Sequence, residues 1–333
     1  MINMFRFLQF SCAAVCVAIF SACGSNRAET LTSADDDVFF ADPTIINLDG
    51  RYYLAGTQGS NPPGFTVLSS TDLQNWSPAS ADTIPNLTPG EKVFGTKGFW
   101  APQFVPTDSC VYMFYTANEQ IALAKADSIN GTYIWDGTAI DDSEKNIDPF
   151  LFTDTDGRHY LYHVRFDHGN FLWVGEFDFN SGHFVEGTLH PVFRNDQPWE
   201  HTLAYESDPI MEGPTVVRLG DKYYLFYSAN HYMSPDYAVG YATAASPLGP
   251  WTKNPENPII HRNIVGERGS GHGDVFTDND GNLRYVYHVH NSDTVPNPRR
   301  TRIVSMNIEK PEDSSLPVKI TVDSATIINP SGI

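Results

Sequence analysis

The sequence predicts an all-β protein, a five-bladed β-propeller in a single domain. A short apolar strand, a tight turn and a tyrosine-rich strand follow one another in that order five times along the chain. The five copies begin at residues 42, 101, 148, 213 and 273 and so lie 47 to 65 residues apart, long enough for one blade each. Across the body of the chain, apolar residues show no helical periodicity, so we do not expect long amphipathic helices.

The first 23 residues are typical of a signal peptide. Arg6 precedes a mostly apolar run at residues 7–20, which is shorter than the roughly 20 residues needed to span a bilayer. Small residues lead into Cys23 and resemble a bacterial lipoprotein processing site, at which Cys23 would be lipidated; plain secretion is the alternative. We expect an exported protein, at the cell surface or in the periplasm, that meets a membrane only through this lipid.

Residues 24–37 are small and polar and predict a tether, so residues 38–333 are assigned to the propeller. Within it, each copy reads as a β-hairpin, because Asp-Gly or Gly-Asp at the turn supplies the positive backbone dihedrals that tight hairpins need. Such turns stand at residues 49–50, 156–157, 220–221 and 280–281. A β-sandwich of unrelated hairpins is the alternative, but it does not explain why the same order of elements recurs.

The charge of the chain excludes one class of partner. With 40 acidic and 21 basic residues, the formal net charge is −19, and no cluster of Lys and Arg reverses it locally. An anionic phosphate backbone would be repelled, so nucleic acid is not expected to bind. Any bound ion should be a cation.

Three acids occupy matching places in the repeats. Asp42 and Asp148 stand at the start of copies one and three, and Glu212 holds nearly the same place in copy four. Because the innermost strands of a propeller run beside its axis, these carboxylates should meet at one mouth of the channel. Repulsion and partial burial would raise at least one pKa, so that a proton donor and an ionised base coexist. Cleavage of a glycosidic bond needs that pair.

Four sequence runs resemble glycoside hydrolase family 43, whose members are five-bladed propellers that invert anomeric configuration. They are Ala41-Asp42-Pro43, Trp100-Ala101-Pro102, Asn146-Ile147-Asp148-Pro149 and Met211-Glu212-Gly213-Pro214. The resemblance covers nearly the whole mature chain. It implies that Asp42 is the general base, that Glu212 is the general acid, and that Asp148 orients Glu212 and raises its pKa.

The resemblance also implies a substrate class, namely arabinose- or xylose-containing polysaccharides of plant cell walls and their oligosaccharides. An exo-acting α-L-arabinofuranosidase is the first expectation, with β-xylosidase and endo-arabinanase as alternatives. A surface carbohydrate-binding lipoprotein without catalysis is a rival of another class, against which the presence of all three acids argues. A fructan-cleaving enzyme is a further rival, but the chain lacks an Asn-Asp-Pro-Asn-Gly run near the first copy.

Further residues are candidates for binding. His272 stands where other copies place their acids, and by the resemblance it would help hold a calcium or sodium ion on the axis, partly through water; a structural histidine is the alternative. The chemistry itself needs no cofactor. Trp100 and Phe99 form either an apolar platform for a sugar ring or part of the core. Arg300 is the arginine expected to contact substrate, with Arg299 and Arg302 in competition, and His288 is expected to pack within its aromatic strand.

Overall fold

The computed structural model describes residues 36–332 except 60–61, 81–84, 202–208 and 314. The predicted signal peptide and nearly all of the predicted tether therefore lie outside the described residues. Within the described ranges, no helix is long and apolar enough to cross a membrane.

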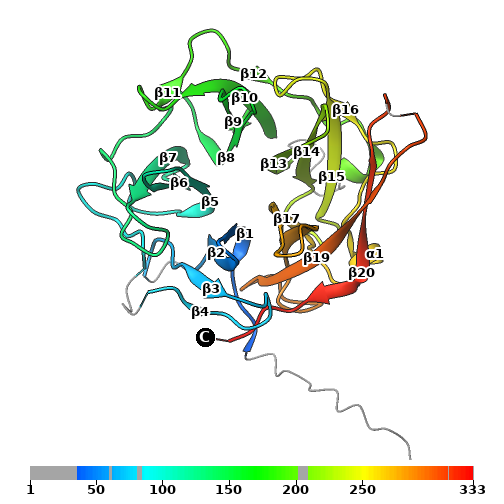
Figure 1. The fold of residues 1–333 in the computed structure, drawn as a ribbon, viewed down its shortest axis with the longest axis horizontal. Coiled ribbons are helices and arrows are strands. Elements are labelled where there is room, and N and C mark those ends of the chain that lie inside the picture. The colour runs from blue at the N-terminus through cyan, green and yellow to red at the C-terminus, as the bar shows by residue number, and fades with distance from the viewer. Residues whose placement is uncertain (1–35, 60–61, 81–84, 202–208, 314, 333) are drawn as a thin grey trace, which may run out of the picture. The chain divides into compact units, whose positions relative to one another are not determined.

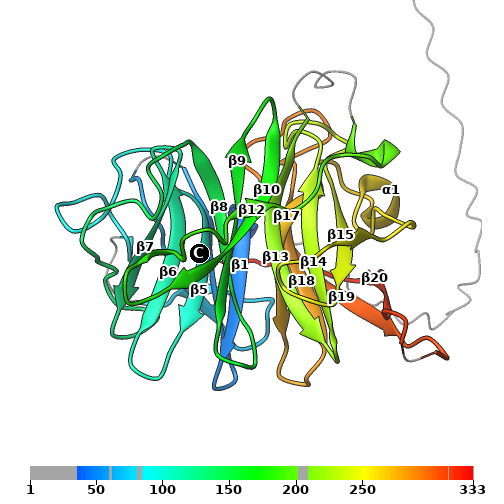
Figure 2. The same cartoon turned by 90° about the horizontal axis from the view of Figure 1, so that it is seen from above.

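Five antiparallel sheets stand around a common axis, which confirms the five-bladed propeller (Figure 1). Each blade begins with its innermost strand, and these strands run roughly along the axis when the ring is seen from the side (Figure 2). The innermost strands are β1 (Ala41–Leu48), β5 (Trp100–Pro106), β8 (Asn146–Thr153), β13 (Met211–Leu219) and β17 (Gly271–Thr277).

The chain then moves outward through each blade, one hairpin at a time. The second strands are β2 (Arg51–Thr57), β6 (Val111–Ala117), β9 (His159–Phe166), β14 (Lys222–Ala229) and β18 (Leu283–Val289). The third strands are β3 (Leu68–Ser70), β7 (Gln120–Ala126), β10 (Asn170–Asp178), β15 (Ala238–Ala244) and β19 (Arg300–Glu309). The outer strands are β4 (Ser77–Pro78), β11 (His183–Phe184), β12 (His190–Pro191), β16 (Thr252–Lys253) and β20 (Lys319–Ile328). In the described part of the chain, two short helices lie in connections, η2 (Pro198–Glu200) and α1 (Arg262–Val265).

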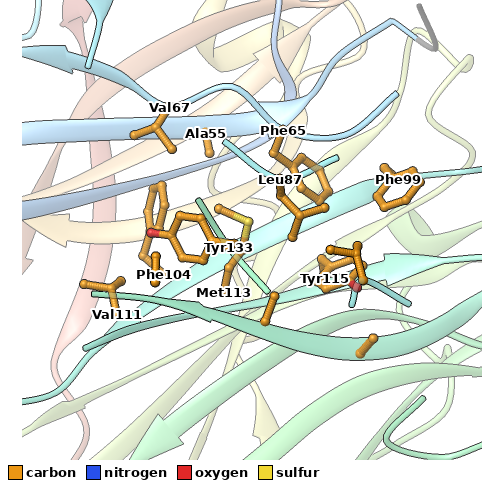
Figure 3. Close-up of a cluster of buried hydrophobic side chains, with 14 of the residues drawn as sticks. Ala55, Phe65, Val67, Leu87, Phe99, Phe104, Val111, Met113, Tyr115 and Tyr133 are labelled. Carbon is orange, nitrogen blue, oxygen red and sulfur yellow. The ribbon is translucent and has the colours of Figure 1, made fainter. Parts of the chain in front are cut away.

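The hydrophobic core is divided into clusters that lie between neighbouring blades. The cluster between the first two blades is shown in Figure 3, where Phe65, Phe99 and Tyr115 pack together. The rings of Phe99 and Tyr115 stack with centroids 5.9 Å apart. Similar clusters join each following pair of blades and join the fifth blade to the first. The apolar faces of the strands thus hold the blades at fixed angles around the axis.

The two ends of the described chain close the ring. The amide of Val38 donates to the carbonyl of Pro330 at 3.0 Å, and the amide of Thr301 donates to the carbonyl of Val38 at 2.9 Å. Asp37 lies 3.3 Å from Nη2 of Arg302, so an ion pair adds to this closure. Isolated bridges from Ser331 to Asp37 and Asn75 also join the C-terminal segment to the first blade.

One backbone feature recurs in all five innermost strands and positions the site. Each strand carries a β-bulge near its start. At the bulge, one residue per blade has a positive φ: Asp42 (48°), Ala101 (44°), Asp148 (55°), Gly213 (61°) and His272 (41°). Non-glycine residues rarely adopt this conformation, and such strain concentrates at functional sites. The bulge brings equivalent residues of the five blades to the same end of the channel.

The strained amides are held in place by the preceding blade. Hydroxyl groups accept the amide hydrogens in three blades: Thr57 from Ala101 at 3.0 Å, Thr116 from Asp148 at 2.9 Å and Ser228 from His272 at 2.8 Å. All three hydroxyls come from the second strand of the neighbouring blade. In the first blade His288 of β18 takes this role, and in the fourth blade Asp148 does.

Candidate active site

A pocket of about 360 Å³ opens at the bulged end of the channel. All five blades contribute to its lining. The lining residues are Asp42, Trp100, Glu119, Ile147, Asp148, Phe166, Asn170, Ile210, Glu212, His231, Tyr232, His272 and Arg299. The structure thus brings together five of the residues that the sequence singled out: the three acids, Trp100 and His272.

Asp42 is buried and surrounded by cationic or polar partners. Arg299 Nη1 lies 2.9 Å from its Oδ1, and Nδ1 of His272 lies 3.3 Å from the same oxygen. Burial alone would raise the pKa of Asp42, but Arg299, His272 and His288 together outweigh it and hold the pKa well below its usual range. Asp42 is therefore ionised at neutral pH, as a general base must be.

Glu212 stands in the opposite electrostatic situation. Burial and the negative charge of Asp42 raise the pKa of Glu212 to about 7, against the opposing effect of hydrogen bonds from Tyr237 and Asn170. Tyr237 donates its hydroxyl hydrogen to Oε1 at 2.8 Å, and Asn170 Nδ2 lies 3.4 Å from Oε2. Around neutral pH, a substantial fraction of Glu212 is thus protonated and able to give up that proton.

Asp148 lies close enough to both other acids to be affected by their charges. Its Oδ2 accepts a hydrogen bond of 3.2 Å from the amide of Gly213, the residue after Glu212. Burial raises the pKa of Asp148 well above its usual range, and repulsion from Glu212 and Asp42 raises it further. Asp148 therefore anchors the peptide that carries Glu212.

Gly213 is required at its position for two reasons. Its φ of +61° is costly for other residues, and a Cβ added there would lie 2.7 Å from the His272 ring. The His272 ring in turn sits beside both Asp42 and Asp148, with Nδ1 3.9 Å from Oδ2 of Asp148. The absence of a side chain at residue 213 is what allows the imidazole to approach the acids.

Two buried rings connect the surroundings of Asp42 and Glu212. His288 accepts the amide hydrogen of Asp42 at Nδ1, 3.1 Å away, which only a neutral imidazole can do with a free ring nitrogen. Burial and the positive charge of Arg299 together lower the pKa of His288 to about 3, although Asp42 opposes the shift, so the ring is neutral. Tyr237, which contacts Glu212, stacks on His288 with centroids 5.5 Å apart. The side chains that contact the two candidate catalytic residues, His288 and Tyr237, therefore pack against each other.

Two residues predicted to bind substrate lie elsewhere. Phe99 does not line the pocket: it is 5% exposed and packs in the core between the first two blades. Arg300 also points away, because its guanidinium pairs with Glu267 at 2.9 Å and with Asp37 at 3.4 Å. The arginine in the pocket is Arg299. Both predictions are corrected: Phe99 and Arg299 are the last residues before β5 and β19, and the side chain of each is turned to a different side from that of its neighbour in the strand.

Three residues around the acids escaped the sequence analysis or were given another role. Tyr237 and Asn170 carry no motif, and His288 was expected only to pack. His288 does follow the repeat, because it occupies the position in its second strand that Thr116 and Ser228 occupy in the second strands of other blades. That equivalence becomes visible only once the strand pairing is known.

The predicted cation would lie in the channel beneath the pocket. A void of about 20 Å³, lined among others by His272 and Asp274, has room for roughly one water-sized occupant. Both oxygens of Asp274 already accept hydrogen bonds, from Thr44 at 2.7 Å and Thr215 at 2.6 Å. Over the described ranges no group of three or more His, Cys, Asp or Glu is arranged to hold a metal. The His and carboxylate side chains here thus form no ready-made ligand cluster, and the cation stays a prediction.

Comparison with known proteins supports the chemistry of this pocket. The family model described as "Glycosyl hydrolases family 43" matches residues 37–312. A solved structure of an endo-1,4-β-xylanase from Bacteroides thetaiotaomicron is 34% identical, with a TM-score of 0.80 over 89% of this chain and 98% of that chain. A thermostable family-43 glycoside hydrolase of known structure is 32% identical, with a TM-score of 0.74 over 85% of this chain and 92% of that chain.

Curated relatives are more distant and differ in activity. The β-D-galactofuranosidase xynD of Aspergillus niger is 26% identical over 88% of this chain and 87% of its own length. The extracellular endo-α-(1→5)-L-arabinanase 1 of Bacillus subtilis is 25% identical over 74% of this chain and 77% of its own. The chain spans only 42% of the length of a xylan 1,3-β-xylosidase from a Vibrio species, to which it is 25% identical.

Proposed function

The chain belongs to glycosyl hydrolase family 43, an inverting family of glycosidases, and from this premise we propose that it is an exo-acting α-L-arabinofuranosidase on plant cell-wall polysaccharide. The observation that carries the acid/base chemistry of this proposal is the pair of opposed pKa shifts in one pocket: Asp42 is ionised while Glu212 holds a proton near neutral pH.

In the proposed reaction, two proton transfers accompany one displacement at the anomeric carbon. Asp42 accepts a proton from a water molecule as the water oxygen bonds to that carbon. Glu212 gives its proton to the glycosidic oxygen as the bond from that oxygen to the carbon breaks. The sugar leaves with inverted configuration, which needs roughly 6.5–9.5 Å between the two carboxyl groups so that the water fits.

Other residues of the pocket would position these groups. Asp148 holds the peptide of Glu212 through the amide of Gly213, and Arg299 keeps Asp42 ionised. Trp100 offers an apolar surface in the lining and is proposed to contact the sugar ring. Arg299 takes over the substrate contact that the sequence analysis assigned to Arg300.

The names of relatives support a five-membered sugar ring. Two relatives matched over more than three quarters of their own length, 87% and 77%, act by their names on β-D-galactofuranoside and on α-(1→5)-L-arabinan. Both sugars are furanosides. The second candidate is cleavage of xylan or its oligosaccharides, which is favoured by the similarity to the endo-1,4-β-xylanase structure.

The decisive experiment compares three 4-nitrophenyl glycosides: α-L-arabinofuranoside, β-D-xyloside and β-D-galactofuranoside. We expect the wild type to release nitrophenol from the arabinofuranoside and the variants Asp42→Asn and Glu212→Gln to lose this activity. Proton NMR of the first-formed sugar should show the inverted anomer. A wild type that turned over none of the glycosides and no arabinan or xylan, yet bound them, would point to the carbohydrate-binding rival.

Export belongs to the same proposal. Two of the relatives are named as extracellular enzymes, an arabinanase and an exo-α-(1→5)-L-arabinofuranosidase. We propose that residues 1–23 direct export of this chain and that Cys23 carries the lipid. Labelling with a fatty-acid analogue, with Cys23→Ser as the control, tests the lipid separately from the enzyme.

A further inference from the structure

A second recess adjoins the active-site pocket and carries no role in the reaction described above. It measures about 580 Å³ and is lined by Glu144, Lys145, Arg165, Phe166, Asp167 and Trp173. Phe166 lines both the pocket and the recess. An ion pair also joins the recess to the pocket: Lys145, which lines the recess, pairs with Glu119, which lines the pocket.

The position of Phe166 relative to Glu212 shows which part of a substrate would reach it. Phe166 and Asn170 are directly opposite each other in the β9–β10 ladder, so their side chains stand on the same face about 5 Å apart. Asn170 contacts Glu212 through its amide nitrogen. Since Glu212 delivers its proton to the leaving oxygen, the sugar that bears this oxygen would lie alongside Phe166.

Phe166 is also exposed to solvent, on a hairpin that has contacts with the rest of the protein on both sides. Its side chain is 39% exposed, although a large apolar ring would gain by burial. The hairpin is tied to its surroundings on both sides: Asn170 donates its amide hydrogen to Pro209 at 2.8 Å, and Asp167 pairs with Arg194 at 2.6 Å. A solvent-facing aromatic ring, paired across the ladder with a residue that contacts Glu212, suits a surface that binds substrate.

The recess beyond Phe166 has the polarity that a sugar chain needs. Arg165 lies over the Trp173 ring, 5.0 Å from its centroid, and Glu144 and Lys145 add charged groups at the border. Hydroxyl groups can pair with such charged side chains, while the aromatic surface suits the C–H faces of sugar rings.

We propose that Phe166 is the platform for the first sugar on the leaving-group side and that the adjoining recess takes the next one. This inference rests on the proposed function. The preferred substrate is then an oligosaccharide or polysaccharide with at least two sugars beyond the cleaved bond, rather than a glycoside of a small alcohol.

The test compares substrates with and without a sugar on the leaving-group side. Wild type, Phe166→Ala and Phe166→Tyr are assayed on the glycosyl fluoride and on the di-, tri- and tetrasaccharide of whichever sugar the wild type cleaves. Fluoride is a leaving group that cannot reach Phe166. Ile134→Ala, which removes another exposed apolar side chain outside the pocket lining, serves as the matched control.

We expect Phe166→Ala to lower kcat/KM for the oligosaccharides by roughly tenfold and to leave the fluoride within about twofold, since a lost aromatic contact of this kind costs about a factor of ten. Phe166→Tyr should restore the oligosaccharide activity, which excludes misfolding. For the wild type, kcat/KM should rise from the disaccharide to the trisaccharide. Equal effects of Phe166→Ala on fluoride and oligosaccharides, or no effect on either, would overturn the inference alone. A wild type inactive on every substrate, the fluoride included, would overturn the proposed function and the inference with it.

Discussion

Arg299 and Asp42 are separated by 257 residues in the chain, yet Nη1 of the arginine lies 2.9 Å from Oδ1 of the aspartate. This contact joins the last blade to the first. It places a permanent positive charge beside the carboxylate that we propose as the general base. The same ion pair therefore adds to the closure of the ring and keeps that carboxylate ionised.

The pH dependence of activity follows from the charges around the two acids. Since the pKa of Asp42 lies well below its usual range and that of Glu212 is raised to about 7, kcat/KM should stay high through mildly acidic pH and fall as pH rises through about 7. Initial rates from pH 3 to 9 measure this profile. A rate that is flat across pH 5 to 9 would contradict the paired-acid mechanism.

Replacing Arg299 by Met should shift both limbs of the pH profile, the acidic rise and the alkaline fall of kcat/KM, to higher pH. The arginine lowers the pKa of Asp42 and also that of Glu212, so its removal raises both. We also expect kcat/KM at the optimum to fall by about tenfold or more, because a charged hydrogen bond is lost. Arg300→Met is the matched control, since that guanidinium lies outside the pocket lining, and it should leave both limbs in place.

Tyr237→Phe should affect the general acid selectively. The tyrosine hydroxyl donates to Glu212 and thereby lowers the pKa of the acid, so its loss should move the alkaline limb to higher pH and leave the acidic limb unchanged. Loss of the hydrogen bond that orients Glu212 should reduce kcat by roughly 10- to 100-fold. The pH profile of kcat separates this role from simple packing, which would move neither limb.

Gly213→Ala tests the close approach of His272 to the acids. The new Cβ would meet the imidazole at 2.7 Å on a backbone with positive φ, so we expect both activity and thermal stability to fall. Gly220→Ala is the control, because Gly220 has a φ of +66° but no atom within 4 Å of an added Cβ. The control should lose only about 1 kcal/mol from backbone strain and keep its activity. Equal losses in the two variants would show that the contact with His272 is unimportant.

Asp274→Asn should change how stability depends on pH. Burial raises the pKa of Asp274 to about 6, so the protonated form is favoured in the folded state. The folded protein should therefore lose stability as pH rises from about 4 through 6, by about 3 kcal/mol relative to the variant, which cannot ionise. Urea unfolding of both proteins at pH 4.5 and 7.5 should show about 2 kcal/mol of this difference, since part of it is already lost at pH 4.5. Parallel stabilities at the two pH values would contradict it.

The predicted calcium or sodium ion near His272 can be tested by the same unfolding assay. After treatment with EDTA, added calcium should raise the melting temperature in proportion to the logarithm of its concentration above the dissociation constant. Magnesium at equal ionic strength is the control for screening. An unchanged melting temperature with EDTA and with calcium would mean that the channel holds no calcium.

The repeats could be recognised in the sequence because each blade is built from strands that follow one another directly in the chain. Each hairpin closes over a short turn such as Asp49-Gly50, and the alternation of apolar residues marks its strands. Since a propeller repeats this unit around an axis, the recurrence of the unit also indicated that Asp42 and Asp148 hold equivalent places. The fold and the three acids followed from these local patterns.

Tertiary structure alone decided which neighbours of those acids belong to the site. Phe99 and Trp100 are adjacent in sequence, as are Arg299 and Arg300, and in each pair one residue lines the pocket while the other is turned into the core or towards another ion pair. Phe99 and Arg299 end the connections before β5 and β19, where strand alternation does not yet apply, so the sequence by itself leaves both choices open. Only the packing of blade against blade determines which side faces the pocket, and it does so through contacts between residues as far apart as Asp42 and Arg299.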